Sequence, residues 1–204
     1  MRFDLFHSIG RIDGLTPQLD DKQVFRHFFA QALLAEDLGF GKIWVAESHF
    51  SSEVQKNNPN PVIPNYHGEV GLNCDSPQLA AHLFGKTKRI GFGTAILNIV
   101  GGNGGPLGAA DRIRSLAFLN AISDNPRRLD IGVASGRFPY INRPYGIVPR
   151  NQTEQLLWKQ TQQLVFAEAL EIFLRTSAGA TISSKDIQRH AYSPALMGSG
   201  DAWQ

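Results

Sequence analysis

The sequence predicts an α/β protein in which strands and helices alternate along the chain. Short, almost wholly apolar runs such as 42–46 are typical of strands that helices bury on both faces. Between these runs lie stretches with apolar residues at helical spacing, and glycine or proline marks the junctions. Strands that alternate with helices form a parallel sheet with right-handed crossovers, so we expect any site at the carboxyl ends of the strands.

The first part of the chain predicts a β-α-β unit. Residues 2–9 mix apolar and polar side chains as a strand does, and Gly10 opens a turn-rich stretch. A helix is expected over 21–38, where apolar residues recur every three or four positions, with Asp20 or Asp21 as cap and Gly39 as the stop. The run 42–46 follows as the second strand.

The remainder repeats the alternation after a long loop over 51–75. Ser76 and Pro77 are typical of a helix start, and that helix is expected to end near Lys86. The further expected elements are a strand over 89–97, a glycine-rich turn over 101–105, a helix over 106–122, a strand over 129–133, a loop over 135–149 and a helix over 153–175.

Length limits the architecture to part of a closed barrel. The chain has 204 residues, of which 42% are hydrophobic and 19% charged, as expected for one soluble globular domain. A full (β/α)₈ barrel usually needs about 250 residues, and only 29 residues follow position 175. We therefore expect a single domain over 1–204, with four βα units over 1–175 and a short tail or hairpin over 176–204.

Charge and cysteine content exclude several classes of protein. Twenty basic and 18 acidic residues are scattered, so the chain has no basic patch for nucleic acid. No stretch of eighteen apolar residues and no signal-peptide pattern occurs, which predicts neither membrane insertion nor secretion. Cys74 is the single cysteine, which excludes an internal disulfide and suits a cytoplasmic location.

Common nucleotide and metal motifs are missing from the sequence. Gly91 and Gly93 lack the third glycine of a dinucleotide fingerprint, because Ile96 stands in its place. The glycines of 101–105 lack the Lys-Ser/Thr of a phosphate-binding loop, and no two of the six histidines have metal-ligand spacing. A metal site is not expected.

Polar and small residues follow three of the predicted strands. They are, together with Phe50, Glu47, Ser48 and His49 after the second strand, Thr94, Ala95 and Asn98 at the third, and Ala134, Ser135, Gly136 and Arg137 after the fourth. Small side chains at such a mouth predict a planar heteroaromatic ligand. The alternative is structural: Thr94 and Ala95 pack a crowded interior, and Glu47 pairs with a cation such as Arg137.

Three segments carry a family resemblance in the right order. They are 35–50 (AEDLGFGKIWVAESHF), 87–95 (TKRIGFGTA) and 128–137 (RLDIGVASGR). These segments resemble the bacterial luciferase-like flavin monooxygenases, and the likeness extends over residues 1 to about 175. The resemblance implies a TIM barrel that uses reduced FMN, supplied by a separate flavin reductase, and O₂ to oxidise aldehydes, alkanes, sulfonates or related substrates.

Individual roles follow from the resemblance alone. Glu47 and His49 fall on the outer residues of the family's Glu-His-His and are the expected catalytic residues, with Ser48 replacing the first histidine. Thr94 and Ala95 match the pair that packs against the flavin ring. Residues 134–137 match the loop at the polar edge and phosphate side of the flavin. The family's His-Pro stretch at its third helix is missing here, since Gly104–Gly108 stands in its place.

The four βα units account for only half of a barrel, which affects what we expect of the chain's partners and of its activity. A partial barrel leaves two strand edges and an apolar interior open. We therefore expect a homodimer, or a partner chain that covers the open barrel, unless the chain is a fragment of a longer oxygenase. The alternative to an oxygenase is a non-catalytic flavin-binding protein, because the family includes short members of that kind.

Overall fold

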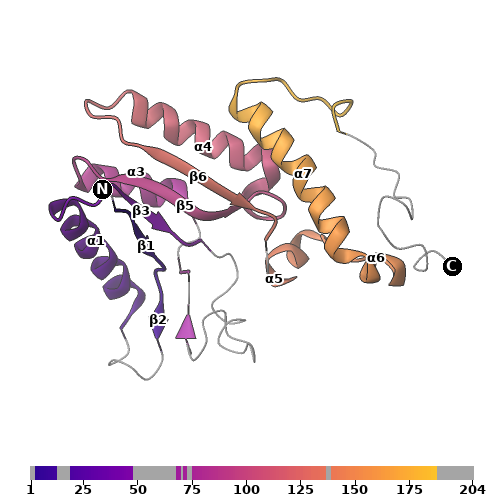
Figure 1. Ribbon diagram of the computed structural model, residues 1–204, viewed down its shortest axis with the longest axis horizontal. Coiled ribbons are helices and arrows are strands. Elements are labelled where there is room, and N and C mark those ends of the chain that lie inside the picture. Colours follow the sequence, from indigo (N-terminus) through magenta and orange to yellow (C-terminus); the bar gives the residue numbers. More distant parts are fainter. Residues whose placement is uncertain are drawn as a thin grey trace. The chain divides into compact units, whose positions relative to one another are not determined.

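The computed structural model describes residues 3–12, 19–47, 68–69, 71–72, 75–136 and 139–187 (Figure 1). Their contacts group into two compact units. The first unit takes in the chain up to Leu97 together with Arg112–Val133, and the second takes in Asn98–Asp111 and the chain from Ala134 onward. Four predicted βα units are present, and the expected alternation of strands and helices is confirmed.

A four-stranded sheet forms the centre of the first unit. Its strands are β1 (Leu5–His7), β3 (Lys42–Val45), β5 (Gly91–Asn98) and β6 (Leu129–Ala134), in the order β1-β3-β5-β6. The pairs β1–β3 and β3–β5 are parallel, as predicted. Phe6, Trp44 and Gly93 are aligned across the sheet, and Leu5, Ile43 and Phe92 form the neighbouring row. Alternate residues of a strand face opposite sides, so each row belongs to one face.

Three helices follow these strands in the expected places. They are α1 (Asp21–Asp37), α3 (Ser76–Lys86) and α4 (Gly105–Ala121). Asp20 caps α1 through a capping box, in which its carboxylate accepts from the Gln23 amide and Gln23 reaches back to Asp20. Asp75 caps α3 by accepting the backbone N–H of Gln78 with its carboxylate. Both caps satisfy helix N–H groups that would otherwise lack partners.

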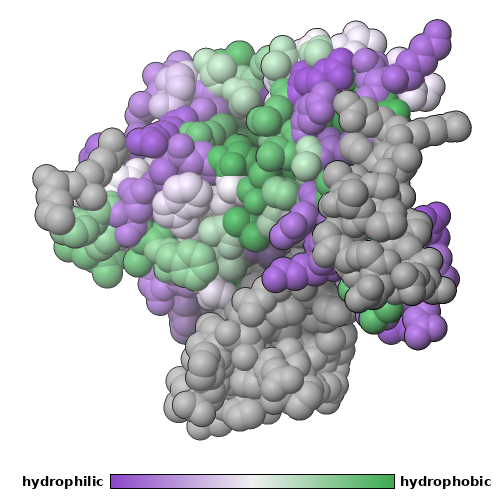
Figure 2. All heavy atoms as spheres, turned by 45° about the vertical axis from the view of Figure 1, so that its right-hand side comes forward, coloured by the Kyte–Doolittle hydropathy of each residue, from purple (hydrophilic) through white to green (hydrophobic). Residues whose placement is uncertain are grey.

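The hydrophobic core lies on the side of the sheet that carries Leu5, Ile43 and Phe92. Those side chains pack with buried residues of the helices, including Phe28 of α1 and Leu83 of α3. The opposite side, which carries Phe6, Trp44 and Gly93, is called the open face below. Phe6 remains 62% exposed. Figure 2 shows hydrophobic residues at the molecular surface between hydrophilic ones.

The second unit contains the remaining helices. Short helices α5 (Pro139–Asn142) and α6 (Gln152–Leu156) precede the long helix α7 (Trp158–Ser177). The described part of this unit also contains two 3₁₀ turns, Gly102–Gly104 and Arg143–Tyr145. Leu157, Ala169 and Phe173 are buried.

Several sequence-based boundaries need correction. The first strand is shorter than 2–9, and a separate strand β2 (Arg11–Ile12) pairs antiparallel with β4 (Gly68–Glu69), which lies in the expected loop over 51–75. The expected helix over 153–175 is broken at Leu157, which lies between α6 and α7. Residues 178–187 contain turns at 178–179 and 184–186 and no strand, and the rest of the predicted tail lies outside the described residues.

Candidate functional site

The start of β5 is fixed by a buried carboxylate of α1. Glu36 is 8% exposed and accepts backbone N–H groups from Lys88, Arg89 and Ile90, at 2.9, 2.6 and 2.8 Å. Burial alone would raise the pKa of Glu36, but the hydrogen bonds from these three amides together with the Arg89 charge hold the pKa below its usual value. This contact ties the end of α1 to the strand that carries Thr94 and Ala95.

Glu47, predicted as catalytic, lies directly after β3. Its Oε2 accepts the backbone N–H of Ser76, the first residue of α3, at 2.7 Å. A carboxylate at a helix N-terminus is favoured by the helix dipole and by the unpaired N–H groups there. Asp75, which caps the same helix, also forms an ion pair with Arg112. The hydrogen bond to Ser76 holds Glu47 beside α3. Glu47 could act on a substrate only with Oε2 still bonded to Ser76, or after the bond breaks.

The end of β5 presents small and apolar groups. Thr94 is 1% exposed, and its hydroxyl donates to the carbonyl of Gly132 in β6 at 2.7 Å. Ala95 is partly exposed, the Ala95–Ile96 peptide bond is cis, and Ile96 is 45% exposed. A Cβ on Gly132 would lie 3.3 Å from Cγ2 of Ile96 and closer still to the Thr94 carbonyl. Ala95, Ile96 and Gly132 thus form an apolar patch, called the β5 shelf below.

The loop after β6 belongs to the second unit. Asn142 donates from Nδ2 to the carbonyl of Ser135 at 2.7 Å, and its Oδ1 accepts from Asn98 at 3.1 Å. Gly136 has φ +80, and a Cβ there would lie 2.7 Å from Nδ2 of Asn98 and 3.0 Å from the Asn142 amide. The left-handed backbone and the close amides both require glycine at this position. The two asparagines therefore hold Ser135 and Gly136 in one arrangement.

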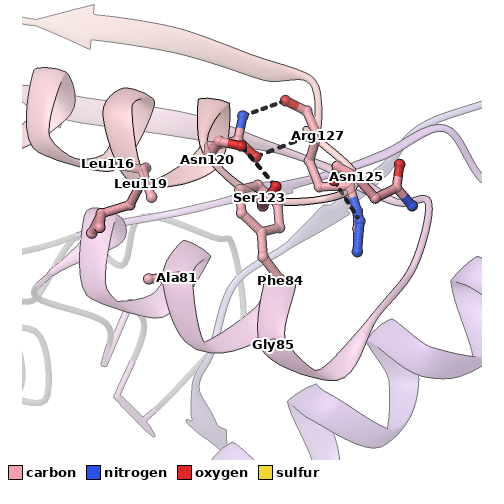
Figure 3. A pocket seen from close by; sticks show the side chains of 9 residues that line it. All are labelled: Ala81, Phe84, Gly85, Leu116, Leu119, Asn120, Ser123, Asn125 and Arg127. Carbon is pink, nitrogen blue, oxygen red and sulfur yellow. Dashed lines mark hydrogen bonds between the residues drawn. The ribbon is translucent and has the colours of Figure 1, made fainter.

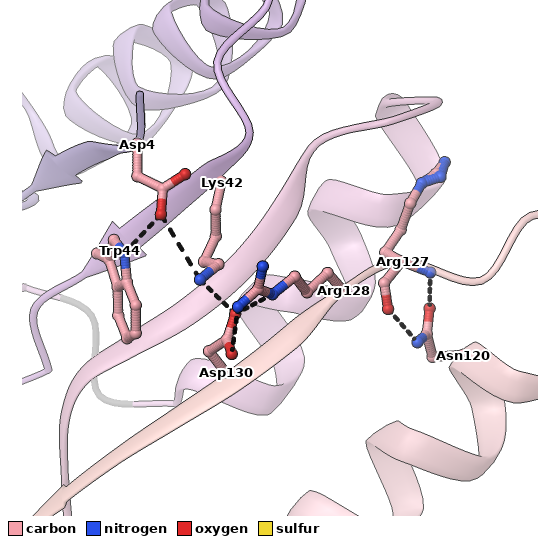
Figure 4. A network of polar contacts seen from close by, with 7 residues as sticks. All are labelled: Asp4, Lys42, Trp44, Asn120, Arg127, Arg128 and Asp130. Carbon is pink, nitrogen blue, oxygen red and sulfur yellow. Dashed lines mark hydrogen bonds and ion pairs between the residues drawn. The ribbon is translucent and has the colours of Figure 1, made fainter. Parts of the chain in front are cut away.

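The open face carries a charged cluster at the amino ends of the strands (Figure 4). Lys42, whose side chain is 4% exposed, forms ion pairs with Asp130 and with Asp4, the latter at 3.6 Å. Its ammonium also lies 4.3 Å from the centre of the Trp44 ring. Hydrogen bonds from Lys42 and Arg128 hold the pKa of Asp130 below its ordinary value. The buried lysine is thus compensated by two carboxylates and an aromatic ring.

A groove on the helical side of the first unit lies between α3 and α4 (Figure 3). Its lining combines apolar side chains, among them Phe84 and Leu116, with Asn120 and Arg127. Asn120 and the Arg127 backbone bond to each other through both amide atoms, and the Arg127 guanidinium donates to the carbonyls of Thr87 and Lys88. These polar groups therefore serve to join the end of α3 to the strand that follows α4.

Comparison with known proteins identifies the family. The family model described as luciferase-like monooxygenase matches residues 1–189. The chain belongs to this family. The luciferase-like match covers all three segments on which the resemblance rests and extends through α7.

Individual relatives of this luciferase-like chain are distant. It is 27% identical over 139 residues to the alkanal monooxygenase alpha chain of the Kryptophanaron alfredi symbiont, a match covering 68% of this chain and 32% of that protein. The monooxygenase RslO1 of Streptomyces bottropensis is 21% identical with a TM-score of 0.57, over 86% of this chain and 42% of that one. This chain thus spans about a third of the curated relative.

Two further solved structures share the fold and differ in cofactor. The oxygenating constituent of 3,6-diketocamphane monooxygenase from Pseudomonas putida, solved with FMN, has a TM-score of 0.55 and 20% identity, covering 86% and 39% of the two chains. An F420-dependent secondary alcohol dehydrogenase with an F420-acetone adduct has a TM-score of 0.54 and 15% identity, covering 85% and 41%. The luciferase-like chain is accordingly a partial TIM barrel, and the fold alone leaves FMN and F420 open.

The predicted site residues divide into three groups. Glu47 follows β3, and Thr94 and Ala95 lie in the middle of β5, all in the first unit; Ala134 ends β6, and Ser135 and Gly136 follow it, in the second. Ser48, His49 and Arg137 lie outside the described residues, so the Glu47–Arg137 pairing stays a prediction. Sequence reasoning named Asn98 at the third strand but missed Ile96 and Asn142, although an apolar residue after Thr-Ala was a visible signal.

Two further properties concern the described residues only. None of their His, Cys, Asp and Glu side chains group in a way that would hold a metal ion. None of their helices is both long and apolar enough to cross a membrane.

Proposed function

We propose that the chain binds reduced FMN and uses O₂ to oxidise a small organic substrate, as a flavin-dependent monooxygenase. The observation that carries this proposal is the luciferase-like family match over residues 1–189. The β5 shelf supports a cofactor of the flavin type, because a flat tricyclic ring needs an apolar surface with few projecting side chains. Gly132 and Ala95 supply such a surface, and Ile96 exposes an aliphatic side chain on it.

The chain's own residues would bind and orient the reactants. When bound, reduced FMN supplies the electrons that activate O₂. Ala95 and Ile96 would contact one face of the ring, while Thr94 fixes β5 to β6 through the hydrogen bond to Gly132. By the family resemblance, residues 134–137 would bind the polar periphery of the cofactor. Glu47 and His49 would orient substrate and oxygen, and the apolar shelf would exclude water from the reacting atoms.

A flavin titration tests the cofactor assignment. Quenching of FMN fluorescence is measured for the unaltered chain, for Ile96→Lys and for Ile122→Lys. Ile122 is 80% exposed and directly follows α4, so its variant controls for added charge. We expect Ile96→Lys to weaken FMN binding at least about tenfold, since it places a charge against an apolar ring, and Ile122→Lys to leave binding unchanged. Equal affinity for all three proteins would refute the shelf as the ring site.

The same titration with F420 tests the rival cofactor. Binding of F420 without binding of FMN would contradict FMN as the cofactor, but would leave the assignment of the fold unchanged. Absence of binding to either cofactor would contradict the proposed function altogether.

A second candidate is a flavin-binding protein without catalytic activity. Two observations favour it. The Glu47 carboxylate already accepts the Ser76 N–H, and Ser48 stands in place of the family's first histidine. Oxygen uptake with FMN, NADH and a flavin reductase separates the candidates. Uptake that depends on an added aldehyde, alkane or sulfonate supports the monooxygenase, whereas FMN binding without such uptake supports the second candidate.

A further inference from the structure

Two buried asparagines of the second unit join the loops that follow β5 and β6. Asn98 ends β5 and Asn142 ends α5, they are 6% and 3% exposed, and Nδ2 of Asn98 donates to Oδ1 of Asn142 at 3.1 Å. The Oδ1 of Asn98 accepts the backbone N–H groups of Val100 and Gly101, at 3.0 and 3.4 Å. A buried side-chain amide with partners on both its oxygen and its nitrogen fixes the groups that it contacts. Asn98 therefore holds the loop after β5 and presents one N–H to Asn142.

Asn142 uses its own nitrogen on the loop after β6. Its Nδ2 donates to the carbonyl oxygens of Ser135 and Gly136, at 2.7 and 3.3 Å. The peptide bond between these two residues is trans, so the N–H of Gly136 points away from the Ser135 carbonyl and hence away from Asn142. Ser135 itself is partly exposed. Asn142 therefore sets the direction of one backbone donor and the position of one residue with a hydroxyl group.

The backbone around Asn142 leaves its amide a single position. Gly101 has φ −106, which any residue adopts, yet a Cβ there would lie 2.6 Å from Oδ1 of Asn142. A Cβ on Gly136 would lie 3.0 Å from Oδ1 and from Nδ2 of the same amide. Both glycines thus allow a close approach of the backbone that a larger residue would prevent. The amide cannot turn without moving one of the two loops.

We propose that Asn142 is a positioning residue for the cofactor and acts on it through Ser135 and Gly136. This inference rests on the proposed function, in which residues 134–137 bind the polar periphery of FMN. The Ser135 hydroxyl and the Gly136 N–H are donors that suit acceptor oxygens of FMN. Asn142 fixes the 135–136 backbone before the cofactor arrives. Binding then does not have to order this loop, and the affinity for FMN is higher.

Replacing the amide nitrogen of Asn142 by oxygen tests this role. Asn142→Asp keeps the size of the side chain but removes the donor and sets a carboxylate oxygen against two carbonyl oxygens. We expect these carbonyls to turn away, and FMN to bind at least about tenfold more weakly. Affinity is measured by quenching of FMN fluorescence, at a temperature at which circular dichroism shows every variant to be folded.

Asn120→Asp is the matched control. Asn120 also bonds to a backbone through both amide atoms, at 2.8 Å each, but its partner Arg127 precedes β6 whereas Ser135 follows it. We expect Asn120→Asp to lower stability and to leave the affinity for FMN unchanged. Unchanged affinity in Asn142→Asp, or an equal loss in both variants, would overturn the inference alone. No FMN binding by the unaltered chain would instead overturn the proposed function, and the inference with it.

A second pair of variants leaves both asparagines in place. Gly101→Ala introduces a Cβ that pushes against Oδ1 of Asn142, and we expect FMN to bind at least about threefold more weakly. Gly85→Ala is its control, because a Cβ on Gly85 of α3 has no atom within 4 Å. We expect this control to bind FMN as the unaltered chain does. Full affinity in Gly101→Ala would count against the role of Asn142 even if Asn142→Asp does not fold.

A double-mutant cycle separates positioning from simple destabilisation. We expect Asn142→Asp to weaken FMN binding less in a Ser135→Ala background than in the unaltered chain, because the hydroxyl that Asn142 positions is already gone. A loss of folding stability alone would not produce this coupling. Independent, additive losses of affinity would overturn the role assigned to Asn142.

Discussion

Replacing Glu36 by glutamine is expected to destabilise the chain by about 2 kcal/mol. The substitution removes the charge that accepts three backbone N–H groups at the start of β5. A hydrogen bond to a charged group contributes roughly 1.5–3 kcal/mol. Lys88 and Arg89 are exposed, so water can replace part of the hydrogen bonding that their N–H groups lose. Ile90 is fully buried, and its N–H depends on the side chain at position 36. One strong contact therefore dominates the expected change.

The assay is denaturant unfolding at pH 7, supported by the thermal midpoint. About 2 kcal/mol corresponds to a drop of roughly 4–8 °C in a chain of this size. Asp37→Asn is the matched control, because Asp37 is the next residue of α1, carries the same charge and is exposed. We expect it to change stability by less than about 0.5 kcal/mol. Equal stabilities of the two variants would refute the role assigned to the buried carboxylate.

The effect of Glu36→Gln is also expected to depend on pH. The pKa of Glu36 is lowered in the folded chain, so the carboxylate adds stability above its unfolded pKa and loses that contribution as pH falls through the folded value. The stability difference between the two proteins is thus full at neutral pH and shrinks in acid. A difference that grows as the pH falls would contradict the assignment.

Three further substitutions test other parts of the structure. Lys42→Met removes one of the two cations that contact Asp130, while Arg128 remains and the carboxylate is partly exposed, so the expected cost at pH 7 is about 1 kcal/mol; unchanged unfolding would argue against the buried ion pair. Gly93→Ala puts a Cβ 2.6 Å from Cδ2 of Trp44 and is expected to shift indole emission, so an identical spectrum would show that the ring lies elsewhere. Gly136→Ala forces a Cβ into the left-handed region and against two amides, with an expected loss of about 2 kcal/mol in unfolding experiments; full stability would contradict that backbone conformation.

Local signals in the sequence predicted most of the fold. The apolar run at 42–46, the Asp20 cap and the Ser76-Pro77 start all correspond to observed elements within one or two residues. Each depends on chemistry among neighbouring residues, which one sequence displays. The break at Leu157 was missed because the apolar spacing continues through it, while Asn151 caps a separate short helix before it.

The site was less predictable because its contacts join distant positions. Thr94 is small and was expected near the carboxyl end of its strand, which suggested contact with a ligand, but it lies in the middle of β5 and its hydroxyl bonds to Gly132, 38 residues further on. The Glu47 carboxylate likewise accepts the backbone N–H of Ser76 at the start of α3, 29 residues away. The strands that carry such residues can be located from periodicity, whereas the direction of each side chain depends on which strand becomes its neighbour.

The uneven chemistry of the open face has a consequence for access. Ion pairs around Lys42 occupy the level where the strands begin, and uncharged groups such as Ile96 and Gly132 occupy the level where they end. A guest molecule with an apolar ring would have to break this salt network to lie at the amino ends of the strands, whereas no described ion pair involves Ile96 or Gly132. Of the two levels, the β5 shelf is therefore the one that favours such a guest.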